Sequence, residues 1–170
     1  MHAVKIPVIL RVALRSRQGG SKERSLRAWK QAEEYISHFV SRVNLEMILP
    51  FIFASLYWEE GSKGAFVFTN TDARMIKIFL GVLRELFGVK NEDIRMLIRL
   101  DGSSDSRACI TYWHKYAALP VANIKININS RQNRTKAQYG ICRIYLKKGG
   151  TMLKRVQCLI SAIVSKTENI

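Results

Sequence analysis

The sequence predicts an α+β fold in which packed helices cover a mixed sheet of about four strands. Its 170 residues suit about one domain, and 48% of them are hydrophobic, which is enough to build a core. Short segments that alternate strictly between apolar and polar residues indicate strands. Longer apolar stripes that follow capping residues indicate helices. After an N-terminal helix the elements run helix, strand, helix, strand, helix, strand, strand, helix, which is typical of an α+β domain.

The N-terminal part is expected to lie outside the main domain. Residues 1–20 predict a basic arm or strand that ends in a linker at Gly19 and Gly20. Residues 21–44 predict a helix with Ser21 as its N-cap, and its apolar stripe is expected to pack on the main domain, residues 45–168. No segment predicts a membrane span, so we expect a cytoplasmic, nucleoid-associated protein. The alternative is an organelle matrix, if the acid-free, Arg-containing N-terminus is a transit segment.

The main domain begins with a strongly apolar helix. Because proline is tolerated only in a first turn, this helix is expected to start at or near Pro50 and to end near Gly61. A strand at 65–69 and a helix capped by Thr71 or Asp72, with Gly88 after its end, should follow. The remaining predicted elements are a strand at 94–100, a helix that starts after Ser104 or Asp105 and stops before Pro120, strands at 124–129 and 139–147, and a helix at 151–165.

The charge of the chain is strongly positive and unevenly placed. Lys and Arg number 28 against 13 Asp and Glu, a net charge of +15, and no acid occurs between residues 106 and 167. A merely solvated surface would mix both signs. Concentrated positive charge therefore favours a polyanionic partner, first nucleic acid and next an anionic membrane surface.

The predicted strands place this charge on one face. In each of the last three strands, apolar residues occupy alternate positions, and Arg, Lys or Asn residues occupy most of the others. These side chains reach phosphates and base edges, and the polar sides of the predicted strands show no acid. The residues expected to contact nucleic acid are Arg95, Arg99, Lys125, Asn127, Asn129, Arg143, Tyr145 and Lys147.

The helix FASLYWEEG carries the only pattern that indicates catalysis. Its small residues Ala54 and Ser55 would let a second helix approach closely, and it ends in Glu59, Glu60 and Gly61. If two copies pair across a two-fold axis, their terminal carboxylates converge. Such oxygen ligands suit Mg²⁺. The alternative is that the helix has only a structural role, with a buried body and solvated acids at its end.

FASLYWEEG resembles the helix motif of the LAGLIDADG homing endonucleases. The longer pieces LYWEEGSKG, VFTNTDARMIKIFLGVLRELFGV and ITYWHKYAALP are similar to a group of small bacterial proteins of that type, over roughly residues 45–165. In this resemblance Ala54 and Ser55 match the small packing pair, and Glu60 matches the metal-binding acid. The resemblance implies a saddle-like sheet in the DNA major groove, a homodimer and Mg²⁺-dependent cleavage of both strands at a long site.

Three functions stay open at this point. The first is a homodimeric, metal-dependent DNA endonuclease, in which Lys63 is a candidate to stabilise charge on the scissile phosphate. Lys63 could equally clamp a phosphate or pair with Glu59. The second is a non-catalytic DNA-binding regulator, and the third an RNA-binding, splicing-assisting protein, although the polar face offers only Tyr145 for stacking on bases.

Cysteines and tryptophans are expected to be structural. The three cysteines form no CxxC pair and lie in apolar runs, which favours buried free thiols over a zinc site. The three tryptophans, Trp29, Trp58 and Trp113, lie in apolar helical stripes and are expected in the core.

Overall fold

The chain divides into two compact units, Met1–Leu45 and Glu46–Ile170, in a computed structural model that describes residues 19–129 and 137–168. The first unit contains the helix α2 (Gly19–Ser41). Gly19 and Gly20 belong to this helix, so the predicted linker and the predicted start at Ser21 are wrong there. Residues 1–18 of the predicted arm lie outside the described residues. The apolar side chains Leu26, Ile36, Phe39 and Val40 of α2 are exposed, and their packing on the main domain stays a prediction.

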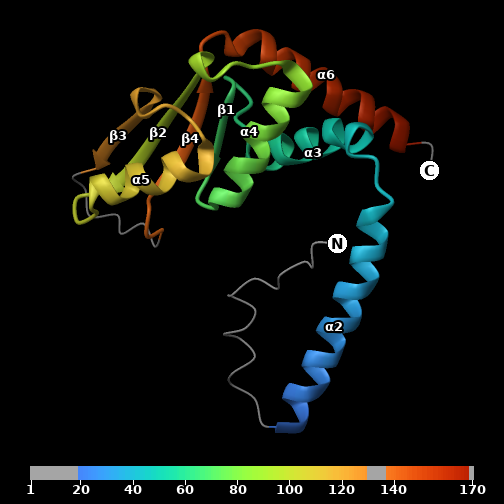
Figure 1. Ribbon diagram of the computed structural model, residues 1–170. Helices are drawn as coiled ribbons and strands as arrows, with labels where there is room; N and C mark the ends of the chain where they lie inside the picture. Colours follow the sequence, from blue (N-terminus) through green and yellow to red (C-terminus); the bar gives the residue numbers. More distant parts are fainter. Residues whose placement is uncertain (1–18, 130–136, 169–170) are drawn as a thin grey trace. The chain divides into compact units, whose positions relative to one another are not determined.

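The second unit has the predicted α+β architecture. The order of its elements is also as predicted, and Figure 1 shows their arrangement. They are α3 (Leu45–Glu60), β1 (Val67–Asn70), α4 (Ala73–Phe87), β2 (Ile94–Asp101), α5 (Ser106–Ala117), β3 (Ile124–Asn129), β4 (Ile141–Leu146) and α6 (Gly149–Thr167), with 3₁₀ turns at Asn91–Asp93 and Val121–Asn123.

The four strands form one mixed sheet in the order β1-β4-β2-β3. Strand β4 pairs antiparallel with both β1 and β2, whereas β2 and β3 are parallel. Parallel neighbours need a crossover connection, and α5 provides it between β2 and β3. The order makes β1 and β3 the two edge strands.

The core lies on one face of this sheet. Ile94, Met96, Ile98 and Leu100 of β2 are at most 1% exposed, which confirms the predicted alternation of this strand. Every helix of this unit adds side chains to the same core, including Phe53 of α3, Phe79 of α4, Trp113 of α5 and Val156 of α6. Stacked aromatic rings join α3, α4 and β1, because the Phe79 ring stacks on both Phe53 and Phe68. The alternate residues of the strands therefore form the other face.

Local signals explain most of the element boundaries. The Asp72 carboxylate accepts a hydrogen bond from the Arg74 N–H at the start of α4, and Gly88 closes this helix in the left-handed conformation with φ 61°. Asp105 caps α5 in the same way through the N–H groups of Arg107 and Ala108. These three predictions are confirmed.

The predicted start of α3 is wrong, because the helix begins at Leu45 and contains Pro50 in its interior. Proline there removes one backbone hydrogen bond, which costs helix stability. Leu49, however, packs against the core from the turn before Pro50. Tertiary packing of this turn thus outweighs the local preference.

Two smaller predictions are also wrong. Strand β4 is shorter than the predicted 139–147, because Gly140 has φ 75° and forms the turn that leads into the strand. Cys109 and Cys142 are buried free thiols as expected, but Cys158 is exposed on α6. Burial raises the pKa of the Cys109 thiol, which keeps it protonated and unreactive.

Candidate nucleic-acid interface

The face of the sheet opposite the core, the open face, carries most of the predicted binding residues. It consists of the strand residues that alternate with the buried ones, and all of them whose burial is described keep part of their surface exposed. The register aligns Thr69, Arg143, Leu97 and Lys125 across the four strands in one row. The open face is made of Val67, Thr69, Arg95, Leu97, Arg99, Asp101, Lys125, Asn127, Ile141, Arg143 and Tyr145.

The open face carries four cations and one acid. The cations are Arg95, Arg99, Lys125 and Arg143. The prediction of an acid-free face is wrong at one position, because β2 extends to Asp101. The Asp101 carboxylate accepts hydrogen bonds of 2.8 Å from the hydroxyls of both Ser103 and Ser104, and these bonds lower its pKa. This acid is therefore ionised at neutral pH, but it lies at the last residue of the strand, and the face keeps a net positive charge.

Arg143 occupies the interior of the open face, on a strand with neighbours on both sides. It lies between Thr69 of β1 and Leu97 of β2 in the register. Its Nε is shielded from solvent and has no hydrogen-bond partner among the described residues. A buried donor without an acceptor lowers the stability of the fold. The contribution of Arg143 to the stability of the free chain therefore does not account for this nitrogen.

The other predicted contact residues differ in how strongly they are held. One terminal nitrogen of Arg95 donates at 2.9 Å to the carbonyl oxygens of both Glu92 and Ile94, which ties this guanidinium to the start of β2. Lys125 and Asn127 are exposed on the edge strand β3. Lys147 lies one residue beyond β4 and is exposed. Tyr145 is half-buried between Val67 and Arg95, and the side chain of Asn129 lies outside the described residues.

The C-terminal end of α3 is fastened to the edge of the sheet at β1. Gly61 forms a β-bridge with Phe68, and the Tyr57 hydroxyl donates to the carbonyl oxygens of Ser62 (2.9 Å) and Ala65 (3.1 Å). A Cβ on Gly61 would collide with the carbonyl and the ring of Tyr57, so only glycine fits there. Burial raises the pKa of Tyr57, which keeps this hydroxyl protonated as a donor. The glycine of the motif thus has a packing reason.

The acids of the motif lie at this fastened end. Glu59 is exposed and Glu60 is half-buried. The Lys63 ammonium donates to the Trp58 carbonyl at 2.8 Å, where it caps the last turn of α3. Lys63 thus has a structural role, and its predicted catalytic role stays a prediction.

The small pair of the motif is split between two sides of α3. Ala54 is buried within its own chain at 1% exposure, whereas Ser55 is exposed. Ser55 lies on an apolar stripe formed by Met47, Phe51 and Trp58, which are 70%, 54% and 50% exposed. The expectation that Trp58 belongs to the core is wrong. Of the two predicted interface residues, Ser55 has free surface to offer to a partner.

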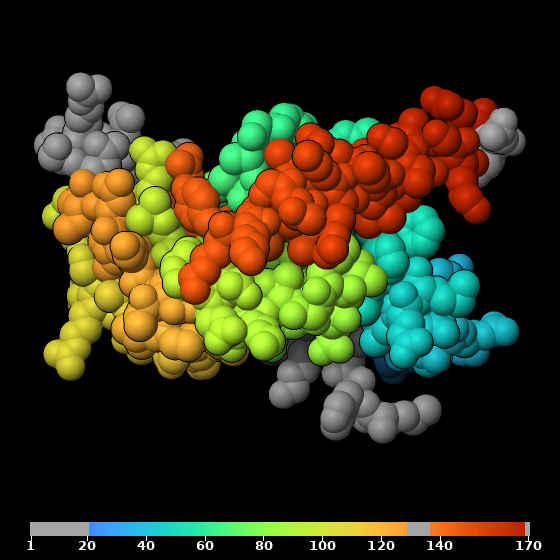
Figure 2. Space-filling view, turned by 90° about the horizontal axis from the view of Figure 1, so that it is seen from above, coloured from blue at the N-terminus to red at the C-terminus, as the bar shows by residue number. Residues whose placement is uncertain are grey.

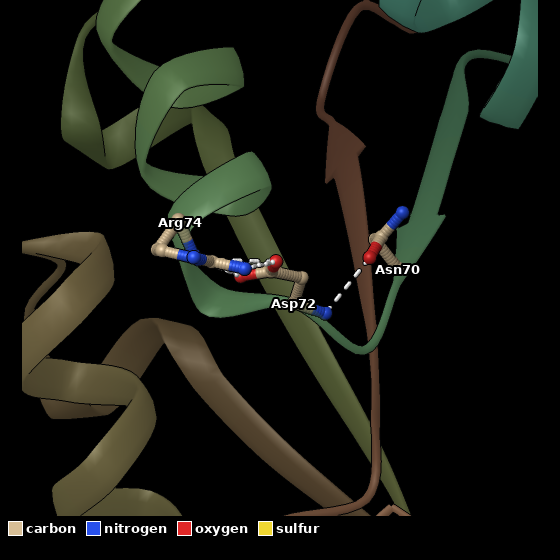
Figure 3. Close-up of polar contacts among 3 residues, drawn as sticks. All are labelled: Asn70, Asp72 and Arg74. Carbon is tan, nitrogen blue, oxygen red and sulfur yellow. Dashed lines mark hydrogen bonds and ion pairs between the residues drawn. The ribbon is translucent and has the colours of Figure 1, made fainter. Parts of the chain in front are cut away.

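The FTNTD segment, part of the longer piece VFTNTDARMIKIFLGVLRELFGV that carries the resemblance, forms the start of α4. Figure 3 shows Asn70 Oδ1 accepting from the Asp72 N–H at 2.8 Å, while the Asp72 carboxylate holds the Arg74 guanidinium. The Arg74 hydrogen bond lowers the pKa of Asp72 and keeps the cap ionised. Asn70 shares the core side of β1 with Phe68, so this segment is explained by the fold and not by the open face.

Neither a ready metal centre nor a membrane segment is evident in the part of the chain that the structure describes. It holds no group of three His, Cys, Asp or Glu side chains that could bind a metal ion. No single helix in that part is long and apolar enough to cross a membrane, and only α2 and α3 taken together, as a pair bent by 113°, meet the criteria of length and composition. No protein-family model, curated protein or solved structure matches the chain.

Proposed function

We propose that this protein binds double-stranded DNA through the open face of its sheet, as a homodimer, and cleaves it with a divalent cation held at Glu60. The observation that carries the proposal is the open face itself, which carries four cations, one of which, Arg143, has a buried guanidinium nitrogen without an acceptor among the described residues. The homodimer and the cleavage are proposed because the α3 motif resembles the LAGLIDADG motif.

The open face favours DNA for three reasons. Arg and Lys neutralise phosphates, and Arg and Asn form the commonest contacts to purine edges in the major groove. The face extends over four strands that lie side by side, so its donors come from several elements. Tyr145 is its only aromatic residue within the described strands, which favours a duplex over single-stranded RNA read by base stacking.

The homodimer is supported by the outer side of α3. Three large apolar side chains at helical spacing around a small residue form a stripe of the kind that packs against another helix. A second copy placed on this stripe would pair the two α3 helices across a two-fold axis. Glu60 lies about 200° around the helix from Trp58, so the two Glu60 residues would approach each other only where the C-terminal ends of the helices meet.

The cleavage proposal rests on Glu60. The described part of one chain holds no group of three metal ligands, so a second copy would have to complete the site. Glu60 fits this role, since carboxylate oxygens suit Mg²⁺ and the negative end of the helix dipole favours a cation there. A bound Mg²⁺ would supply charge stabilisation at a phosphate. Glu60 would hold it, and the open face would position the duplex.

The binding test removes two charges from the open face. The double variant Arg99→Gln/Lys125→Gln should lower the slope of log K against log salt by about 2, since each neutralised phosphate contributes about 0.9. The matched control is Lys77→Gln/Lys115→Gln, which removes the same charge from exposed positions on α4 and α5. Equal effects of both variants would show that only net charge matters and would reject the open face.

The cleavage test compares the two neighbouring acids. Glu60→Gln should abolish Mg²⁺-dependent cutting of a library of random duplexes and leave duplex affinity intact, whereas Glu59→Gln, about 100° away around the helix, should only weaken cutting. Tight binding by the unaltered protein without cutting in Mg²⁺ or Mn²⁺ would establish the second candidate, a DNA-binding protein without nuclease activity. The use of Lys63 as a helix cap favours this candidate.

A further inference from the structure

A second basic surface begins where β4 ends. It consists of Lys147 and Lys148, directly before α6, and of Lys154 and Arg155 in the second turn of that helix; we call it the α6 patch. All four side chains are exposed. Figure 1 shows that α6 starts at the end of β4, the strand that carries Arg143 and Tyr145. The α6 patch therefore follows the open face directly in the sequence, on a helix that packs against the core side of the sheet.

The position of these cations opposes the stability of α6. The N-terminal end of a helix is the positive end of its dipole, where acids stabilise and cations destabilise. The first turn of α6 contains no acid, and Lys148 at its N-cap position makes no capping hydrogen bond. Within the described residues the one ion pair joins Arg74 to Asp72, so no carboxylate neutralises the α6 patch. An external anion would remove this repulsion.

The composition of the patch indicates a phosphate backbone. The large hydrophobic residues that are exposed include none from α6, so the patch offers nothing to insert into a lipid bilayer. Arg155 follows Lys148 by seven positions, about 10 Å along the helix axis, and lies on about the same side of α6. That distance is roughly three base-pair steps of a duplex. Hydrated cations spaced in this way fit phosphates of a DNA backbone.

We infer that the α6 patch binds the phosphate backbone of the duplex beyond the segment that the open face contacts, and so lengthens the DNA site. This inference rests on the proposed DNA-binding function. It assigns positioning and affinity to Lys147, Lys148, Lys154 and Arg155, and leaves base recognition to the open face.

The test is the double variant Lys154→Gln/Arg155→Gln, measured by fluorescence anisotropy on a duplex at several salt concentrations. Its salt slope should fall by about 2, which corresponds to an affinity loss of about 60-fold at 0.1 M salt and none near 1 M. The same loss should occur on unrelated duplexes. Its melting temperature should stay equal or rise, because α6 loses two unfavourable charges. The Lys77→Gln/Lys115→Gln variant is the control for net charge.

The outcomes separate this inference from the proposed function. An unchanged slope in the α6 variant, together with a reduced slope in Arg99→Gln/Lys125→Gln, overturns the inference and leaves the open face standing. The reverse result rejects the open face and keeps the α6 patch as a phosphate-binding surface. If the α6 variant loses affinity for phosphatidylserine vesicles but not for DNA, the partner is a membrane and the inference is wrong.

Discussion

Arg143 is where function and stability should conflict most directly. Its stem lies between Thr69 and Leu97, and its Nε is shielded and finds no acceptor in the part of the chain that the structure describes. An unsatisfied buried donor costs about 1–3 kcal/mol. Arg143→Met keeps an unbranched stem and removes that donor. Because part of the side chain is exposed, we expect the lower end, a gain of about 1 kcal/mol in the free energy of unfolding.

The same substitution should weaken DNA binding. Losing one phosphate contact lowers the salt slope by about 0.9, and losing a bidentate base contact costs about 1–3 kcal/mol of discrimination. Urea unfolding with an unchanged m value measures the gain in the free energy of unfolding. Fluorescence anisotropy at several salt concentrations measures the loss of DNA binding. Arg99→Met is the matched variant, since no orphaned nitrogen is found on Arg99, and it should lose binding without gaining stability.

Two results would refute this reasoning. If Arg143→Met lowers the free energy of unfolding by 1 kcal/mol or more, the guanidinium is already satisfied in the free protein and is a structural group. If Arg143→Met is more stable but binds DNA with an unchanged salt slope, the orphaned nitrogen does not face the duplex. Arg143→Lys restores the charge without the Nε, so it should recover the slope but not base discrimination.

Two further predictions concern the fold and the dimer. Gly140→Ala should destabilise the protein by about 2–4 kcal/mol in urea unfolding, because φ is 75° and the added Cβ would lie 2.5 Å from the Arg99 carbonyl oxygen. Near-wild-type stability would show that the turn into β4 can rearrange. Ser55→Arg should yield a folded monomer by light scattering, whereas Ala54→Leu should overpack the core and cost about 1–3 kcal/mol. A dimer that survives Ser55→Arg would place the interface elsewhere.

The sequence predicted well those elements whose signals are local. Asp72, Gly88 and Asp105 mark helix ends by side-chain and backbone preferences that act within a few residues. The alternation of β2 needs only one buried face. The parallel pairing of β2 with β3 was beyond such reasoning, because strand order depends on contacts between residues far apart in the chain.

The candidate site was harder to predict in α3. This helix is apolar on nearly all sides, so its sequence does not indicate which side faces the core. Ala54 and Ser55 are neighbours in the motif, yet one is buried and the other exposed. Thr69, beside Arg143 on the open face, was also missed, because the predicted strand at 65–69 carries no charge that would reveal its polar side.

The C-terminal end of α3 and the N-terminal end of α6 share one feature: each carries charges that the helix dipole disfavours. Glu59 and Glu60 lie at the negative end of α3, and Lys147 and Lys148 lie at the positive end of α6. Selection for stability alone would exchange these signs. The first arrangement would attract a cation and the second an anion, which are the two partners that the proposed cleavage of DNA requires. Neutralising either end should therefore leave the fold as stable or more stable while impairing function, and a clear loss of stability at either end would identify those charges as structural.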